Sequence, residues 1–129
     1  MTSDLRPSID ALTGLVDGRG TCTVDGPVVL LLPNEQGWPI RILAEREPVR
    51  VLTGSASRIV VGADGDDLWS PVLEVVDSVL DGRAEEYFGT DDEGPLTPIG
   101  YRVWGAGGER RALDDEAAVV EVHRAPAWR

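Results

Sequence analysis

The clearest secondary-structure signal in the chain is the segment Trp69-Ser70-Pro71-Val72-Leu73-Glu74-Val75-Val76-Asp77-Ser78-Val79-Leu80-Asp81-Gly82. Ser70 is a favourable N-cap residue, and Pro71 suits the first helical position because its missing N–H would have no partner there. Gly82 can adopt the left-handed conformation that commonly ends a helix. The segment therefore predicts a helix over 71–81.

The expected helix is amphipathic, with two unlike sides. Apolar residues recur at helical spacing on one side, which we expect to pack on the core: Val72, Leu73, Val76, Val79 and Leu80. The other side, which we expect to be acidic and solvated, carries Glu74, Asp77, Ser78 and Asp81. A negative charge near a helix C-terminus is unfavourable, so Asp81 is either balanced by Arg83 or retained for another purpose.

The rest of the chain predicts one further helix and a series of short strands. Ser8 and Gly18 bracket a short N-terminal helix at 8–17. Apolar runs between turn residues predict strands at 21–24, 28–32, 38–44, 49–52, 57–61, 83–88, 96–104 and 117–123. Asp25-Gly26 is typical of the turn of a hairpin joining the first two. The run Val28–Leu32, apolar throughout, is typical of a central strand covered on both faces.

These elements predict a single α+β domain over residues 1–129, because one hydrophobic core normally serves a chain of this length. About seven short, mostly antiparallel strands are expected to form a twisted sheet with the helix 71–81 packed on it. A half-open barrel wrapped around that helix is the alternative. The tail 124–129 is expected at the surface, with Trp128 either docked or loose.

The charge of the chain restricts its partners. The 23 acidic and 12 basic residues give a net charge of −11, which disfavours nucleic acid and anionic membranes as partners. An acidic balance fits a soluble protein, or one that attracts a basic protein partner by long-range electrostatics. The chain contains no lysine, which excludes Schiff-base and P-loop lysines.

The sequence is typical of a soluble cytoplasmic protein. Cys22 is the lone cysteine, so no intrachain disulfide can form. Residues 1–7 lack the pattern of a secretory signal. The longest apolar run, Val28–Pro33, is too short to cross a bilayer.

No motif indicates catalysis, a cofactor or a bound metal. Cys22 and His123 form the one possible thiol–imidazole pair, and about a hundred residues separate them. The acidic run 64–67 lacks the ligand spacing of a calcium loop. Glu85 and Glu86 are adjacent on an expected strand and so point to opposite faces. The glycine-rich run 105–108 lacks the spacing of a phosphate-binding loop and is expected to join two strands.

The remaining candidates are residues that suit contact with a protein partner. They are Trp38, Trp69, Glu74, Asp77, Asp81, Asp91, Asp92 and Glu93. Tryptophan is a frequent interface anchor, and surrounding carboxylates would favour an arginine- or lysine-rich surface. We therefore expect a non-catalytic acidic protein-binding module, such as an immunity protein, antitoxin or accessory factor with a basic partner. The alternative is a small enzyme or ligand-binding protein with its site between the helix and the curved sheet.

Overall fold

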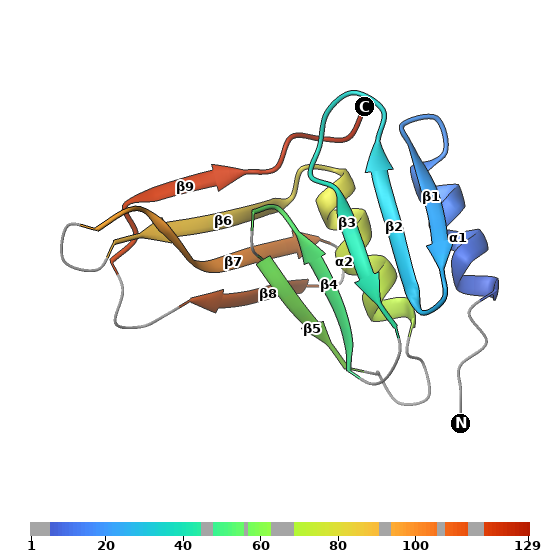
Figure 1. The fold of residues 1–129 in the computed structure, drawn as a ribbon, viewed down its shortest axis with the longest axis horizontal. Coiled ribbons are helices and arrows are strands. Elements are labelled where there is room, and N and C mark those ends of the chain that lie inside the picture. The colour runs from blue at the N-terminus through green and yellow to red at the C-terminus, as the bar shows by residue number, and fades with distance from the viewer. Residues whose placement is uncertain are drawn as a thin grey trace.

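The computed structural model describes residues 6–44, 48–55, 57–62, 69–90, 94–105, 108–113 and 118–129. Within these residues the chain forms two helices and nine strands (Figure 1). They are α1 (Arg6–Val16), β1 (Gly20–Asp25), β2 (Val28–Pro33), β3 (Ile40–Leu43), β4 (Val49–Thr53), β5 (Ser57–Val61), α2 (Trp69–Leu80), β6 (Ala84–Gly89), β7 (Thr97–Gly105), β8 (Gly108–Leu113) and β9 (Glu121–Arg124). The predicted α+β class is confirmed. Neither described helix is long and apolar enough to cross a membrane.

The first sheet is a meander of five antiparallel strands in the order β1-β2-β3-β4-β5. The predicted β1–β2 hairpin is confirmed, but its two turn residues are Gly26 and Pro27, because Asp25 pairs with Val28. Gly26 has a positive φ of 57°, which glycine adopts without strain. The turn thus lies one residue later than Asp25-Gly26 suggested.

The second sheet has four antiparallel strands in the order β8-β7-β6-β9. The prediction of about seven strands in one sheet was therefore wrong, and the described strands do not form the half-open barrel considered as an alternative. Strand β8 was not anticipated because its sequence, Gly-Glu-Arg-Arg-Ala-Leu, lacks the alternation of a half-buried strand. Pairing with β7 from Gly100 to Gly105 defines it instead.

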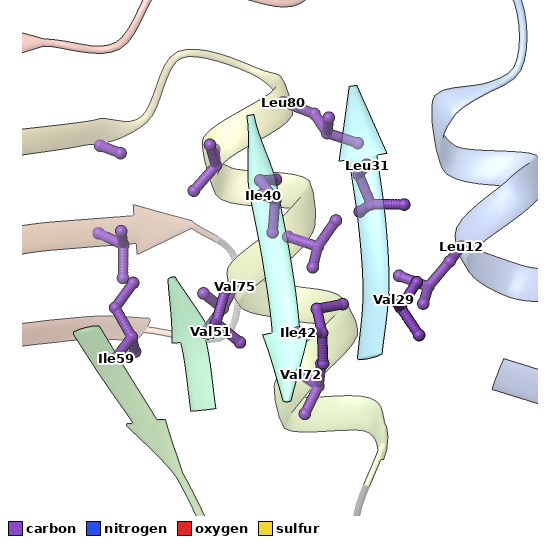
Figure 2. Packing of buried hydrophobic residues seen from close by; sticks show 14 of the residues in the cluster. Leu12, Val29, Leu31, Ile40, Ile42, Val51, Ile59, Val72, Val75 and Leu80 are labelled. Carbon is purple, nitrogen blue, oxygen red and sulfur yellow. The ribbon is translucent and has the colours of Figure 1, made fainter. Parts of the chain in front are cut away.

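The hydrophobic core lies between the five-stranded sheet and the two helices, both of which lie on one face of that sheet (Figure 1). Alternate residues of β3, β4 and β5 point into it, as Ile40, Ile42, Val51 and Ile59 show in Figure 2. These side chains meet Val72, Val75 and Leu80 of α2 and Leu12 of α1. The same cluster continues into the second sheet through Ala84 and Val103.

The predicted helix stop at Gly82 is confirmed, although α2 ends at Leu80, one residue before the predicted end at 81. Gly82 has φ of 75°, and its N–H donates to the carbonyl of Val79 at 3.1 Å. The N–H of Arg83 donates to the carbonyl of Ser78 at 2.7 Å, which completes a Schellman motif. The start differs from the prediction, because the helix begins at Trp69 and includes Ser70.

Helix α2 is covered on more sides than the pattern of two unlike faces predicted. Ser78, expected to face solvent, is buried, and so is Val75. Leu73 is only partly buried. The reason is that β7 packs on α2 in addition to the five-stranded sheet and α1. A Cβ atom on Gly105 of β7 would lie 2.9 Å from Ser78 Oγ, so glycine permits this close approach.

The tail 125–129 is docked, which is one of the two placements considered for Trp128. Trp128 is 4% exposed, its N–H donates to the carbonyl of Leu80 at 2.8 Å, and its Nε1–H donates to the carbonyl of Trp38 at 3.1 Å. Its ring occupies the space that a side chain at Gly37 would need. The tail therefore joins the end of α2 to the β2–β3 connection.

Replacing Trp128 by alanine should lower the free energy of unfolding by about 3–5 kcal/mol, because a large buried aromatic ring would leave a cavity. Urea denaturation followed by circular dichroism measures the change. Arg129→Ala is the matched control, since its backbone makes the contacts and its side chain is exposed. Equal stability of both variants and the wild type would contradict the docked tail.

Candidate functional site

The structure does not gather the predicted partner contacts on one surface. Trp69 begins α2, whereas Trp38 lies beside Trp128 at the other end of that helix. Both tryptophans are partly buried and pack against the hydrophobic core. Residues 91–93, which hold the other predicted acidic contacts Asp91, Asp92 and Glu93, lie outside the described residues.

Two of the three carboxylates of the predicted helix 71–81 are neutralised within the protein. Arg83 Nη2 lies 3.4 Å from Asp77 Oδ2 and 3.3 Å from Asp81 Oδ2, and Arg19 Nη1 lies 3.3 Å from Asp81 Oδ1. The expected balance of Asp81 by Arg83 is thus confirmed. These pairs are partly exposed and contribute little stability, but they offset the negative charge locally. Glu74 is exposed and makes no ion pair with any described residue.

Glu86 is a buried carboxylate that joins the two sheets. Its side chain in β6 is 1% exposed. One carboxylate oxygen accepts the backbone N–H of Ser55 at 2.8 Å, and the other accepts the hydroxyl of Ser57 at 2.7 Å. The carboxylate also fills the space that a side chain at Gly54 would occupy. Glu86 therefore holds the β4–β5 turn in place.

The position of Glu86 follows from the alternation of β6. The prediction that Glu85 and Glu86 point to opposite faces is confirmed, because Glu85 is partly exposed and accepts the hydroxyl of Tyr87 at 3.2 Å. Ala84 and Phe88, two residues away on either side, are buried with Glu86. That apolar setting is the sequence signal that could have identified Glu86 as a buried acid.

Glu86→Gln should lower the free energy of unfolding by about 1.5–3 kcal/mol, because charge-assisted hydrogen bonds to Ser55 and Ser57 would be lost. The neighbouring substitution Glu85→Gln is the matched control and should cost less than about 1 kcal/mol. Both changes are measured by urea denaturation at neutral pH. A larger loss for Glu85→Gln than for Glu86→Gln would contradict the assignment.

The face of the five-stranded sheet opposite the helices carries two rows of side chains across the strands. One row is Thr23, Leu30, Arg41, Leu52 and Arg58. The other is Asp25, Val28, Leu43, Arg50 and Val60. Residues paired across an antiparallel sheet point to the same side, so these ten side chains share one surface, which we call the Arg/Leu face.

The apolar residues of the Arg/Leu face are incompletely covered. Val60 is 50% exposed, and Leu30, Leu43 and Leu52 are partly exposed. Leu32, which follows Leu30 on the same side of β2, is 40% exposed. Strand β2 is an inner strand of its sheet, as predicted. The prediction that it is covered on both faces was wrong, because both helices pack on the same side.

The arginines of the Arg/Leu face have no polar partners among the residues that the structure describes. Within the described part of the chain, Arg41, Arg50 and Arg58 form no ion pair, and their side chains donate no hydrogen bond. Their directly paired neighbours on the adjacent inner strands are apolar, as Leu52 is for both Arg41 and Arg58. The ten residues include one acid, Asp25 at the β1 edge.

A hollow of about 440 Å³ lies at one end of the Arg/Leu face. It is lined by Leu30, Arg41, Leu52 and Arg58 together with Pro39 and the β4–β5 turn. That turn is the one held by Glu86. The buried carboxylate therefore fixes one wall of the hollow.

A second cavity, of about 350 Å³, lies between α2 and the β7–β8 hairpin. Its described lining includes Glu74, Asp77, Arg83, Glu109 and Arg110. Asp77 is paired with Arg83, and Glu109 Oε2 lies 2.9 Å from Nε of Arg102. Among the described lining residues, Glu74 is thus the one carboxylate without an ion pair.

The outer face of the second sheet carries an aromatic and cationic group. The guanidinium carbons of Arg102 and Arg124 lie 4.5 and 5.3 Å from the centre of the Trp104 ring. The hydrogen bond to Glu109 raises the pKa of Arg102.

Burial raises the pKa of Tyr87, and the hydrogen bond to Glu85 adds to this shift. Burial also raises the pKa of Tyr101, which lies on the opposite face of β7 from Trp104.

The two tyrosines of the chain should ionise above pH 10.0 in the folded protein and nearer 10.0 in urea. Because the folded pKa is raised, the associated stability is complete below pH 10 and is lost as the pH rises through the folded value. Absorbance of tyrosinate during pH titration measures this, and Tyr87→Phe and Tyr101→Phe assign the signals. Equal midpoints in the two solvents would contradict the shifts.

The structure does not bring together the residues considered for catalysis or metal binding. Cys22 lies in the first sheet and is partly buried, whereas His123 lies in the second sheet, exposed and 2.8 Å from Glu121. Residues 64–67 lie outside the described residues. Within the described ranges, no three His, Cys, Asp or Glu side chains are grouped closely enough to hold a metal ion.

Comparison of the chain with protein-family models, with curated proteins and with solved structures finds no match. The chemistry of its own surfaces is therefore the basis for assigning a function.

Proposed function

We propose that this protein is a non-catalytic domain that binds another protein through the Arg/Leu face. The observation that carries this proposal is an exposed sheet face made of apolar and arginine side chains that have no internal ion pairs in the described chain. Contiguous exposed apolar surface with a polar rim is characteristic of interaction sites.

The sequence of β2 supports the proposal. A strand with one solvated face normally alternates apolar and polar residues, whereas β2 is apolar at Val28, Leu30 and Leu32 as well as at its buried positions. The helices cover only one of these two apolar faces (Figure 1). A partner bound to the Arg/Leu face would bury the second apolar face of β2.

Several biological roles would use such a surface. An immunity protein or antitoxin that covers the active site of a toxin is one, and an accessory subunit is another. The basic partner predicted from the net charge stays a prediction, and Glu74 is the described residue of that set best suited to it. The cytoplasm is the compartment we propose, since Cys22 has no second cysteine to pair with.

The alternative function is that of a small enzyme or ligand-binding protein. The cavity of about 350 Å³ between α2 and the β7–β8 hairpin favours it, because its volume lies in the range of small-molecule sites. The pairing of Asp77 and Glu109 with arginines counts against acid–base chemistry there. Binding of a charged ligand beside Glu74 is the form of this alternative that the cavity supports best.

The double substitution Leu30→Ser and Leu52→Ser should weaken partner binding at least about tenfold, since the few residues that carry most of the binding free energy cluster near the centre of an interface. Tagged wild-type and variant proteins are used to capture partners from the source cell, and mass spectrometry quantifies what is recovered. Val122→Ser is the matched control, because Val122 is 50% exposed but lies in β9, away from the Arg/Leu face.

Two results would contradict the proposal. Undiminished recovery of the same partner by the double variant would exclude the Arg/Leu face. Recovery of no specific partner by the wild type, at physiological and at low salt, would exclude the protein-binding function itself. Thermal unfolding of each variant verifies that the fold is retained before binding is compared.

A further inference from the structure

We propose that the partner seated on the Arg/Leu face is an acidic protein surface, whose carboxylates face Arg41, Arg50 and Arg58 and whose apolar side chains contact the leucines between them. This inference rests on the proposed protein-binding function and specifies the chemistry of the partner. It differs from the basic partner that the net charge alone suggests.

The three arginines form a compact triangle. Arg41 and Arg58 belong to the same row on β3 and β5, with Leu52 of β4 between them. Two strand spacings separate them, about 10 Å. Arg50 lies on β4, two residues from Leu52, which places it about 7 Å from that row. A partner that matches this arrangement carries carboxylates about 8–10 Å apart around an apolar side chain.

The availability of these guanidinium groups distinguishes them from the four arginines whose side chains are held by other described residues. Arg19, Arg83 and Arg102 are held in ion pairs, and Arg124 donates to the carbonyl of Gly82. The arginines of the Arg/Leu face have no such partners among the described residues. A guanidinium group can bind a carboxylate through two parallel hydrogen bonds, so an acidic surface satisfies all three.

Two other occupants fit the face less well. A second copy docked face to face around a two-fold axis would bring the two arginine triangles together, and Asp25 is the one carboxylate that each copy offers on that face. A nucleic acid would leave Leu30, Leu43, Leu52 and Val60 without apolar partners. A different protein that offers both carboxylates and apolar groups would provide partners for the three arginines and for the exposed apolar side chains.

The test uses fluorescently labelled polymers whose chemistry is known. A random copolymer of glutamate and tyrosine offers carboxylates and apolar rings, poly-glutamate offers carboxylates alone, and single-stranded oligothymidylate offers phosphates. Binding is measured by fluorescence anisotropy at about 0.15 M salt, where charges beyond about 8 Å are screened. We expect the glutamate–tyrosine copolymer to bind at least about fivefold more tightly than either other polymer.

The decisive variant is the triple substitution Arg41→Gln, Arg50→Gln and Arg58→Gln. We expect it to weaken copolymer binding at least about tenfold. The matched control changes Arg110, Arg111 and Arg129 to Gln, which alters the net charge equally at positions outside the Arg/Leu face. It should retain binding within about threefold. Arg41→Gln and Arg58→Gln, each at an exposed position, serve singly if the triple variant fails to fold.

The outcomes separate this inference from the proposed function. Three results would overturn the inference that the partner is acidic. They are an equal loss of copolymer binding in both triple variants, tighter binding of oligothymidylate than of the copolymer, and absence of copolymer binding by the wild type. If the captured cellular partner is lost by the Leu30→Ser and Leu52→Ser variant but retained by the arginine variant, protein binding stands and the acidic partner fails. If the wild type captures no partner, the protein-binding function fails whatever the polymers show.

Discussion

The packing of α2 on the inner face of the five-stranded sheet is the contact on which the other elements depend. Val72, Val75 and Leu80 fill the space above Ile40, Ile42 and Val51, and these residues exclude water almost completely. Burial of such side chains supplies the main favourable free energy of folding. The end of the same helix accepts the N–H of Trp128, and its Ser78 lies against β7, so displacement of α2 would release both the tail and the second sheet.

Local signals predicted the parts of the fold that local interactions determine. The helix stop at Gly82, the β1–β2 hairpin and a strand within 38–44 are determined by neighbouring residues, and the structure confirms them. The division into two sheets and the existence of β8 depend on which strands pair across long distances in sequence. No residue within Glu109–Leu113 encodes that pairing by itself, because β8 becomes a strand through its bonds to β7.

The candidate surface was predicted less well, because net charge describes the whole chain and does not locate its charges. Asp77 and Asp81 were expected to face a partner. Both pair with Arg83, which directly follows α2 in sequence, and Asp81 also pairs with Arg19 from the start of the chain. The apolar run Val28–Leu32 did contain the relevant information. That run predicted that both faces of β2 are packed against other residues, and in the described chain only the face toward the helices is buried.

The docked tail also has a consequence for the order in which the structure forms. Strands β1 to β5 join neighbours in sequence, whereas the hydrogen bond from Trp128 to Trp38 spans 90 residues. Closing a loop of that length costs about 2 kcal/mol more entropy than closing one of about ten residues. Non-local contacts of this kind form late. The meander and α2 should therefore assemble first, and the tail should dock on them last. Amide hydrogen exchange would then show the tail opening as a separate unit, at a lower free energy than the strands it covers.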